Sequence, residues 1–230
     1  MAKKRMPGSE RRSQIIAAAR RVFSQQGYDG AKTLQIAREA NVSEALVYRH
    51  FPSKLALYRA VLRQVFVEQD RNWEDVGIKS AGAGGIVRAL HAFFRSCVPG
   101  TERTGSPDPN RMMLASLAGD GSYAALIYRR SLRRNQQSVL AAHEQGRAAG
   151  EIAGEPLDVN TLSMFAEHVG TMMTAICALP AGARPYGVTD GELARQATWF
   201  CCRGMGISEA VIARHLDEAD STPASGQTAA

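Results

Sequence analysis

The sequence predicts an all-α protein with a small N-terminal domain and a larger C-terminal domain, and three observations carry that prediction. Apolar residues recur at helical spacing through most of the chain, and no stretch shows the alternation expected of a strand. A glycine-rich stretch at residues 77–85 interrupts the pattern. Basic side chains concentrate before it, because residues 1–63 hold 13 Lys and Arg against 4 Asp and Glu, whereas residues 64–230 hold 15 against 18.

This distribution of charge favours contact between the N-terminal quarter and a polyanion, although a merely solvated basic face is an alternative. The four cysteines have neither the spacing of a zinc site nor that of a disulfide framework, so we expect no metal and a reducing compartment. No apolar run is long enough for a membrane span, and no secretion signal follows the basic N-terminus. We therefore expect a soluble, cytoplasmic protein with no membrane partner and no cofactor.

The first element is an amphipathic helix that we expect to begin at Ser9 as its N-cap and to stop at Gly27. Its apolar stripe includes Ile15, Val22 and Phe23, while arginines occupy the other faces. Residues 1–8 precede it as a flexible basic arm that either enters a minor groove or only aids solubility.

Two short helices follow, at Thr33–Ala40 and Glu44–His50. Asn41 lies between them, and asparagine is the residue other than glycine that best tolerates positive φ, so we expect a tight turn there. Ser43 is the expected N-cap of the second short helix.

The proline at position 52 ends that helix, since a residue before proline is disfavoured in the helical region. Ser53 then opens a fourth helix that continues to about Trp73. Three successive helices with a tight turn between the second and the third, together with a basic surface, are typical of a helix-turn-helix module, which binds DNA through the helix that follows the turn.

The remainder, residues 74–218, is predicted to form one helical domain, and residues 219–230 a disordered tail without an apolar anchor. Residues 77–85 are interpreted as the connection between the two domains. The expected helices are Ile86–Val98, Asn110–Leu117, Tyr123–Ala149, Val159–Leu179 and Gly191–Leu216.

Three segments closely resemble the DNA-binding signature of the TetR family of regulators. They are Gly27 with Tyr28, residues 36–43 (IAREANVS) and residues 47–54 (VYRHFPSK), in the family's order and spacing. The resemblance implies a helix-turn-helix DNA-binding domain at residues 9–62 and a ligand-binding and dimerisation domain after it. It also implies a homodimeric transcriptional regulator on a palindromic operator in double-stranded DNA, which we expect to be a repressor released by a small, largely apolar effector.

The same resemblance assigns the DNA contacts. Tyr48, His50 and Lys54 are expected to bond phosphates, and Arg49 is the expected base reader because its guanidinium fits guanine. Relatives often have polar residues at Leu34 and Leu46, so the sequence is read there through thymine methyl groups or not at all. Glu44 either accepts a bond from a cytosine or stabilises the start of its helix. The full set of expected DNA contacts is Thr33, Leu34, Glu44, Ala45, Leu46, Tyr48, Arg49, His50 and Lys54.

Dimerisation is expected because one recognition helix covers only a few base pairs, and the family pattern points to Val159–Leu179 and Gly191–Leu216 as the interface. An accumulation of Met, aromatic and His side chains predicts an adaptable apolar ligand pocket, although such residues are more often ordinary core. The pocket candidates are His91, Phe94, Met112, Met113, Tyr123, Tyr128, Phe165, His168, Met172 and Trp199.

Two alternatives stay open. Adjacent Cys201 and Cys202 allow a regulator that responds to oxidation, although buried cysteines are the commoner explanation. A helical enzyme with an accessory basic domain is the other, but no known catalytic motif is present, so we expect no enzyme.

Overall fold

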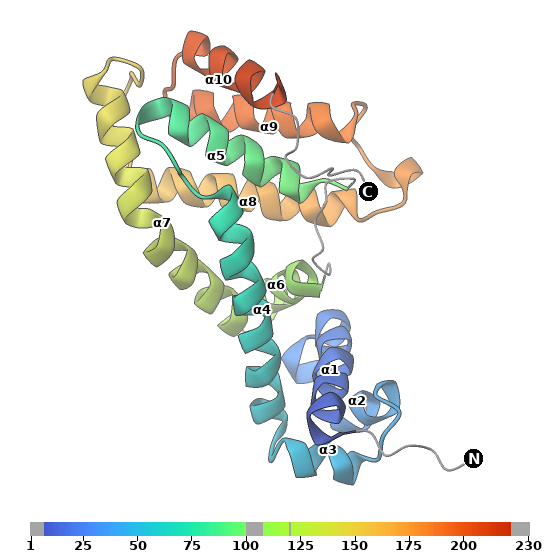
Figure 1. The fold of residues 1–230 in the computed structure, drawn as a ribbon. Coiled ribbons are helices and arrows are strands. Elements are labelled where there is room, and N and C mark those ends of the chain that lie inside the picture. Colours follow the sequence, from blue (N-terminus) through green and yellow to red (C-terminus); the bar gives the residue numbers. More distant parts are fainter. Residues whose placement is uncertain (1–6, 100–107, 120, 222–230) are drawn as a thin grey trace, which may run out of the picture. The chain divides into compact units, whose positions relative to one another are not determined.

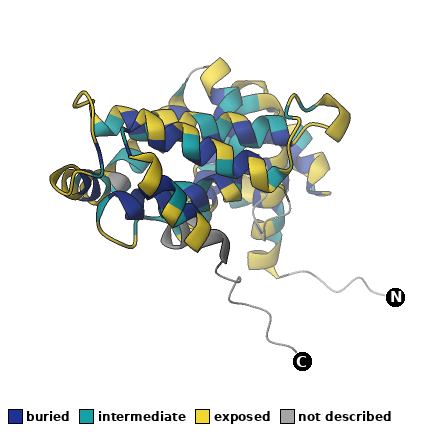
Figure 2. Ribbon diagram, turned by 90° about the horizontal axis from the view of Figure 1, so that it is seen from above, coloured by how far each residue is buried: buried dark blue, intermediate teal, exposed yellow. Residues whose placement is uncertain are grey.

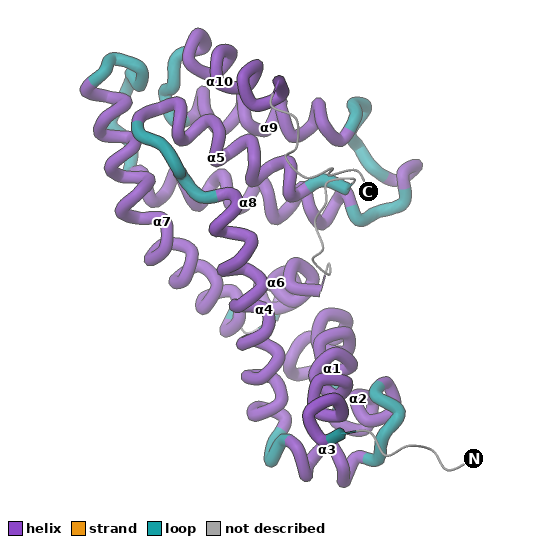
Figure 3. Tube along the Cα trace, in the orientation of Figure 1, coloured by secondary structure: helices purple, strands orange, loops and turns teal. Residues whose placement is uncertain are grey.

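The computed structural model describes residues 7–99, 108–119 and 121–221, and within these ranges the regular structure is helical (Figure 3). The predicted all-α fold class is therefore confirmed. None of the helices in the described ranges combines the length and the hydropathy needed to cross a bilayer. The helices are α1 (Gly8–Gly30), α2 (Thr33–Glu39), α3 (Glu44–His50), α4 (Lys54–Val76), α5 (Gly82–Cys97), α6 (Asp108–Ala118), α7 (Ser122–Ala148), α8 (Val159–Cys177), α9 (Asp190–Gly204) and α10 (Glu209–Ser221), with a 3₁₀ turn at Ala181–Ala183.

The chain divides into two compact units, and the division falls inside α4 and α7 (Figure 1). The first unit contains residues 1–73 and 105–128, and the second contains residues 74–104 and 129–230. The sequence predicts a single boundary near residue 74, whereas the structure also places α6 and the start of α7 with the N-terminal helices.

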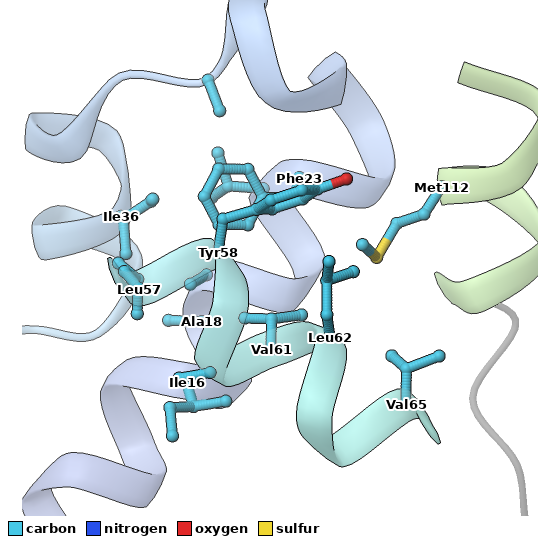
Figure 4. Close-up of a cluster of buried hydrophobic side chains, with 14 of the residues drawn as sticks. Ile16, Ala18, Phe23, Ile36, Leu57, Tyr58, Val61, Leu62, Val65 and Met112 are labelled. Carbon is cyan, nitrogen blue, oxygen red and sulfur yellow. The ribbon is translucent and has the colours of Figure 1, made fainter. Parts of the chain in front are cut away.

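Burial explains why α6 joins the first unit. Met112 of α6 and Tyr123 of α7 belong to the same buried apolar cluster as α1 and α4. Figure 4 shows Met112 pointing toward Leu62 of α4. Arg20 of α1 adds two hydrogen bonds, of 2.7 and 2.9 Å, to the carboxylate of Glu68 on α4.

Helix α1 starts earlier and ends later than predicted. Pro7 holds the N-cap position without a side-chain bond, so Ser9 lies inside the helix and does not cap it. At Gly27, φ is 67°, which makes a kink after which a final turn reaches Gly30. Gly27 thus has the positive φ that glycine tolerates, but it kinks α1 and does not end it as predicted.

The second unit is built around α5, which packs against α8, α9 and α10. Figure 2 shows how buried residues alternate with exposed residues along the helices. The predicted glycine-rich connection proves to be partly helical, because Gly82–Gly85 form the first turn of α5. A Cβ at Gly84 would meet the His215 ring, and one at Gly85 would meet the carbonyl of Ser80, so these glycines permit close packing.

The predicted helix Gly191–Leu216 is two helices, and this expectation is wrong. The break lies at Gly206, where φ is 77° and a Cβ would meet the carbonyl of Ala153. Backbone hydrogen bonds from Ala153 N to Gly206 O (2.9 Å) and from Ser208 N to Glu151 O (2.9 Å) join the loop between α7 and α8 to the loop between α9 and α10. The apolar pattern continues across the break, so periodicity alone does not reveal it.

Candidate nucleic-acid interface

The turn between α2 and α3 has the geometry that the sequence predicts. Asn41 adopts φ of 53°. The hydroxyl of Ser43 accepts a hydrogen bond of 3.2 Å from Leu46 N, and the hydroxyl of Ser53 accepts one of 3.0 Å from Ala56 N. Both serines thus satisfy backbone donors at the starts of α3 and α4.

The start of α2 has a lysine where a capping hydroxyl is usual. Here the side-chain oxygen of Gln35 accepts a bond of 3.1 Å from Lys32 N, which is the reciprocal half of a capping box. The start of α2 is thereby defined at Thr33 without a Ser or Thr cap.

Helix α3 is anchored by Val47 and by Phe51 just after its end, both of which are buried in the first unit. Ala45, Tyr48 and Arg49 lie on the opposite, exposed side of this short helix. This is the arrangement that a recognition helix requires, because the side that does not pack on the module is the side that can enter a groove.

None of the nine expected DNA contacts is buried, and all nine lie on α2, α3 or the first residue of α4. Leu34 and Tyr48 expose 46% and 45% of their surfaces. Glu44, Leu46 and His50 are half-buried. The structure thus gathers these residues on neighbouring short elements of the first unit.

A hydrogen bond that the sequence does not predict joins the two short helices. The hydroxyls of Thr33 and Tyr48 are 3.1 Å apart, across 15 positions of sequence. This bond orients the Tyr48 phenol beside the start of α2, and each hydroxyl keeps further capacity for hydrogen bonding. The local sequence does not predict a pairing between side chains of different helices.

Lys54 is also positioned more firmly than its sequence context indicates. Its Nζ donates a bond of 3.3 Å to the carbonyl oxygen of Asp29 and lies 4.6 Å from the centre of the Tyr28 ring. Two of its three N–H donors stay available for a phosphate. Tyr28, which the resemblance includes as a motif residue, therefore holds the lysine in place by a cation–π contact.

Arg12 adds a cation that sequence analysis does not single out. Its guanidinium carbon lies 4.9 Å from the centre of the Phe51 ring, next to the end of α3. Gln14 of the same helix donates a bond of 3.0 Å to the carbonyl oxygen of Ala40. Helix α1 thus supports the turn and contributes positive charge near it.

The ligand-pocket candidates do not form one group, because they divide between the two units. In the first unit, Met112, Met113 and Tyr123 are buried in the core, and Tyr128 packs against it. Burial raises the pKa of the Tyr123 phenol, which therefore stays neutral. These four side chains are part of the packing that holds α6 and α7 to the first unit.

In the second unit, His91 and Phe94 are buried, while Phe165, His168 and Met172 are exposed on α8. The nitrogen Nδ1 of His91 is 3.5 Å from the hydroxyl of Thr198 inside the core. Two of the candidates, Phe165 and Trp199, line the same groove, which has a volume of about 860 Å³ and lies beside α8 and α9.

That groove is mostly apolar, and two of the aromatic side chains that line it are exposed. Phe200 exposes 70% of its surface and Phe165 exposes 59%. Arg203 is the charged residue of the lining; its guanidinium carbon lies 4.9 Å from the centre of the Trp199 ring, and its Nη2 forms an ion pair of 2.8 Å with Glu209. A surface of this chemistry suits an apolar partner.

All four cysteines are buried, and Cys177, Cys201 and Cys202 are free thiols. Burial raises the pKa of Cys201 to about 11 and raises that of Cys202 further, so both are neutral thiols near neutral pH. In the parts of the chain that the structure describes, no three His, Cys, Asp or Glu side chains are grouped as metal ligands.

Comparison with known proteins identifies the helix-turn-helix region. The family model described as bacterial regulatory proteins of the TetR family matches residues 15–61. The chain is similar to the HTH-type transcriptional activator FasR of Mycolicibacterium smegmatis, with 48% identity over 60 residues that cover 26% of this chain and 27% of that protein. It is also similar to the HTH-type transcriptional regulator HbdR of Aromatoleum sp., with 50% identity over 90 residues that cover 38% of each protein. These matches thus span well under half of the relatives' own length.

Solved structures extend the likeness of the fold to most of the chain. The structure of the ketosteroid transcriptional regulator KstR2 of Mycobacterium tuberculosis has a TM-score of 0.60 at 15% identity and covers 86% of this chain and 96% of that one. Salmonella enterica GusR has a TM-score of 0.55 at 19% identity, with 88% and 99% covered. At such low identity the likeness concerns the fold alone. Together the comparisons show that residues 15–61 match the TetR family model of bacterial regulatory proteins and that the chain shares the fold of these solved structures.

Proposed function

We propose that the protein is a transcriptional regulator that binds a palindromic operator in double-stranded DNA. The observation that carries this proposal is the exposed surface of α2, α3 and the start of α4, where Tyr48, Arg49 and Lys54 project from a module whose other side is packed. A helix-turn-helix with such a surface presents hydrogen-bond donors to phosphates and base edges without exposing its core.

In this proposal, Tyr48, His50 and Lys54 bond phosphates and set the position of α3 in the major groove. The bond between Tyr48 and Thr33 supports this role, because it restricts the phenol before DNA arrives. Arg49 reads a guanine through O6 and N7, a contact worth about 1–3 kcal/mol of discrimination. Glu44 either accepts from a cytosine or stabilises the start of α3.

The DNA-binding form is proposed to be a homodimer, because two recognition helices spaced by one DNA turn are needed for affinity. The apolar groove beside α8 and α9 supports this, since Phe165 and Phe200 would lose their exposure against a second copy. Gly170 of α8 is not proposed to contact the second copy, because a Cβ at this position would meet the Phe93 ring of the same chain. Gly170 therefore serves packing within the protomer.

A small, largely apolar effector is proposed to bind in the C-terminal part of the chain and to release the protein from DNA, which makes the protein a repressor. Binding would favour a state in which the separation of the two recognition helices no longer matches the groove repeat. The effector site itself is proposed in the second unit, since the first-unit candidates Met112, Met113 and Tyr123 are committed to the core.

Regulation through oxidation of Cys201 or Cys202 is less well supported, because burial disfavours the reactive thiolate in both. An enzymatic role has no sequence motif in its favour, and the described residues contain no group of potential metal ligands that would support one.

The proposal is tested by selecting preferred duplexes from a randomised DNA pool and comparing affinities at about 0.15 M salt, where non-specific contacts are weak. We expect a palindromic site with half-sites about one helical turn apart, which binds at least about 1,000-fold more tightly than a scrambled duplex. Equal affinity for the two duplexes would contradict the proposal.

A further inference from the structure

The DNA-facing surface contains an apolar side chain that phosphate binding does not explain. Leu34 is the second residue of α2, and it exposes 46% of its surface next to Thr33, whose hydroxyl contacts Tyr48 of α3. A leucine has no donor for a phosphate or for the polar edge of a base. Its exposure has no role in packing either, because Ile36 and Ala37 supply the buried side of α2.

The tilt of helical side chains places Leu34 at the N-terminal end of α2, where Thr33 contacts Tyr48. Side chains of an α-helix tilt toward its N-terminus, so Leu34 leans toward the residues that begin α2. Tyr48 and Arg49 are exposed on the facing helix. A leucine beside these side chains lies within the surface that is proposed to enter the groove.

The major groove offers one apolar feature that distinguishes base pairs, which is the C5 methyl group of thymine. We infer that Leu34 is a specificity-determining residue that reads a thymine methyl group in each half-site, an inference that rests on the proposed function and deepens it. Leu46 is the weaker candidate for this contact because it is half-buried, whereas Leu34 is exposed.

The inference predicts the composition of the preferred site. Arg49 selects a guanine, and Leu34 selects a thymine in the same half-site. Covering one methyl group with an apolar side chain changes affinity by about fourfold, so two symmetric contacts change it by roughly fifteenfold.

The test starts from the duplex selected with the intact protein and replaces its thymines one symmetric pair at a time by uracil, which removes only the methyl group. We expect one pair of replacements to weaken binding by about fifteenfold, as measured by fluorescence anisotropy. In the variant Leu34→Ala, the same replacement should have an effect below about twofold, although the variant still binds.

Leu117→Ala is the matched control, because Leu117 is a leucine on α6 of the same unit that exposes 50% of its surface. This variant should keep the full difference between thymine and uracil. If no uracil replacement weakens binding, or if Leu34→Ala keeps the difference, the inference is wrong while the proposed function stands. If the pool yields no preferred duplex, the proposed function fails and the inference fails with it.

Discussion

The surface of α2 and α3 and the groove beside α8 and α9 are both exposed, yet they differ in chemistry. The first carries a guanidinium, hydroxyls and a positioned ammonium among a few apolar side chains. The second is mainly apolar, with two aromatic side chains at its edge. A hydrated polyanion suits the first surface, and a protein partner that stays bound suits the second. The difference supports the proposal that the first unit binds DNA and that the second unit binds a second copy.

The largest effect is expected when the apolar groove is made charged. Phe200→Asp places a carboxylate where a second copy is proposed to cover the ring, so we expect monomers at micromolar concentration and a loss of DNA affinity of more than about 100-fold. Analytical ultracentrifugation and anisotropy measure the two quantities. Val188→Asp is the control, since Val188 is also an exposed apolar residue of the second unit but does not line the groove. A dimeric Phe200→Asp protein would contradict the assignment of this surface.

The next effect concerns the close packing at the start of α5. Gly85→Ala would force a methyl group onto the carbonyl of Ser80, which we expect to lower the free energy of unfolding by about 1–3 kcal/mol. Gly191→Ala is the matched control, because nothing lies within 4 Å of its added Cβ and alanine is the better helix former. It should be neutral or stabilising. Urea denaturation followed by circular dichroism measures both, and equal effects would show that the first turn of α5 is not packed as described.

Some of these structural features can be predicted from the sequence, and others cannot. Turn and cap positions such as Asn41 and Ser43 were predictable, because a single residue type carries the local conformational preference. The helical start of α5 was not predictable, because a glycine-rich sequence favours a flexible connection. Only the structure shows that other groups occupy the space that a Cβ would need. Contacts such as the one between Thr33 and Tyr48 depend on tertiary structure and have no signature in sequence spacing.

The sequence also does not predict that α6 belongs to the first unit, for a related reason. Methionines such as Met112 and Met113 can either line a pocket or fill a core, and only the structure decides that they are buried with α1 and α4. Likewise, the break before α10 depends on the fit of Gly206 against Ala153, which the apolar pattern does not encode.

A smaller effect is expected at the cap of the recognition helix. Ser43→Ala removes the side-chain acceptor for Leu46 N, so the free energy of unfolding should fall by about 1 kcal/mol. Ser43→Asn, which can cap the helix equally well, should restore most of that loss. Thermal unfolding by calorimetry gives the comparison. If alanine and asparagine behave alike, the hydroxyl does not stabilise α3.

The smallest effect is expected from oxidants. Because burial raises the pKa of Cys201 to about 11, only about one molecule in 10,000 would carry the thiolate at pH 7. Alkylation of the native protein by iodoacetamide should therefore be slow at pH 7 and become faster as the pH rises toward 11. Mild peroxide should leave DNA affinity unchanged. Rapid modification of Cys201 at pH 7 with loss of DNA binding would instead favour regulation by oxidation.

The central claim is that the exposed side of α3 reads DNA sequence, and Arg49 tests it most directly. The measurement is the ratio of affinities for the selected and the scrambled duplex at about 0.15 M salt, in the intact protein, in Arg49→Ala and in Arg63→Ala. Arg63 is an exposed arginine further along α4, so its loss changes the charge of the unit equally. We predict that Arg49→Ala lowers the ratio by about tenfold to a hundredfold, whereas Arg63→Ala leaves it within about twofold. An unchanged ratio in Arg49→Ala, or an equal fall in both variants, would contradict the account.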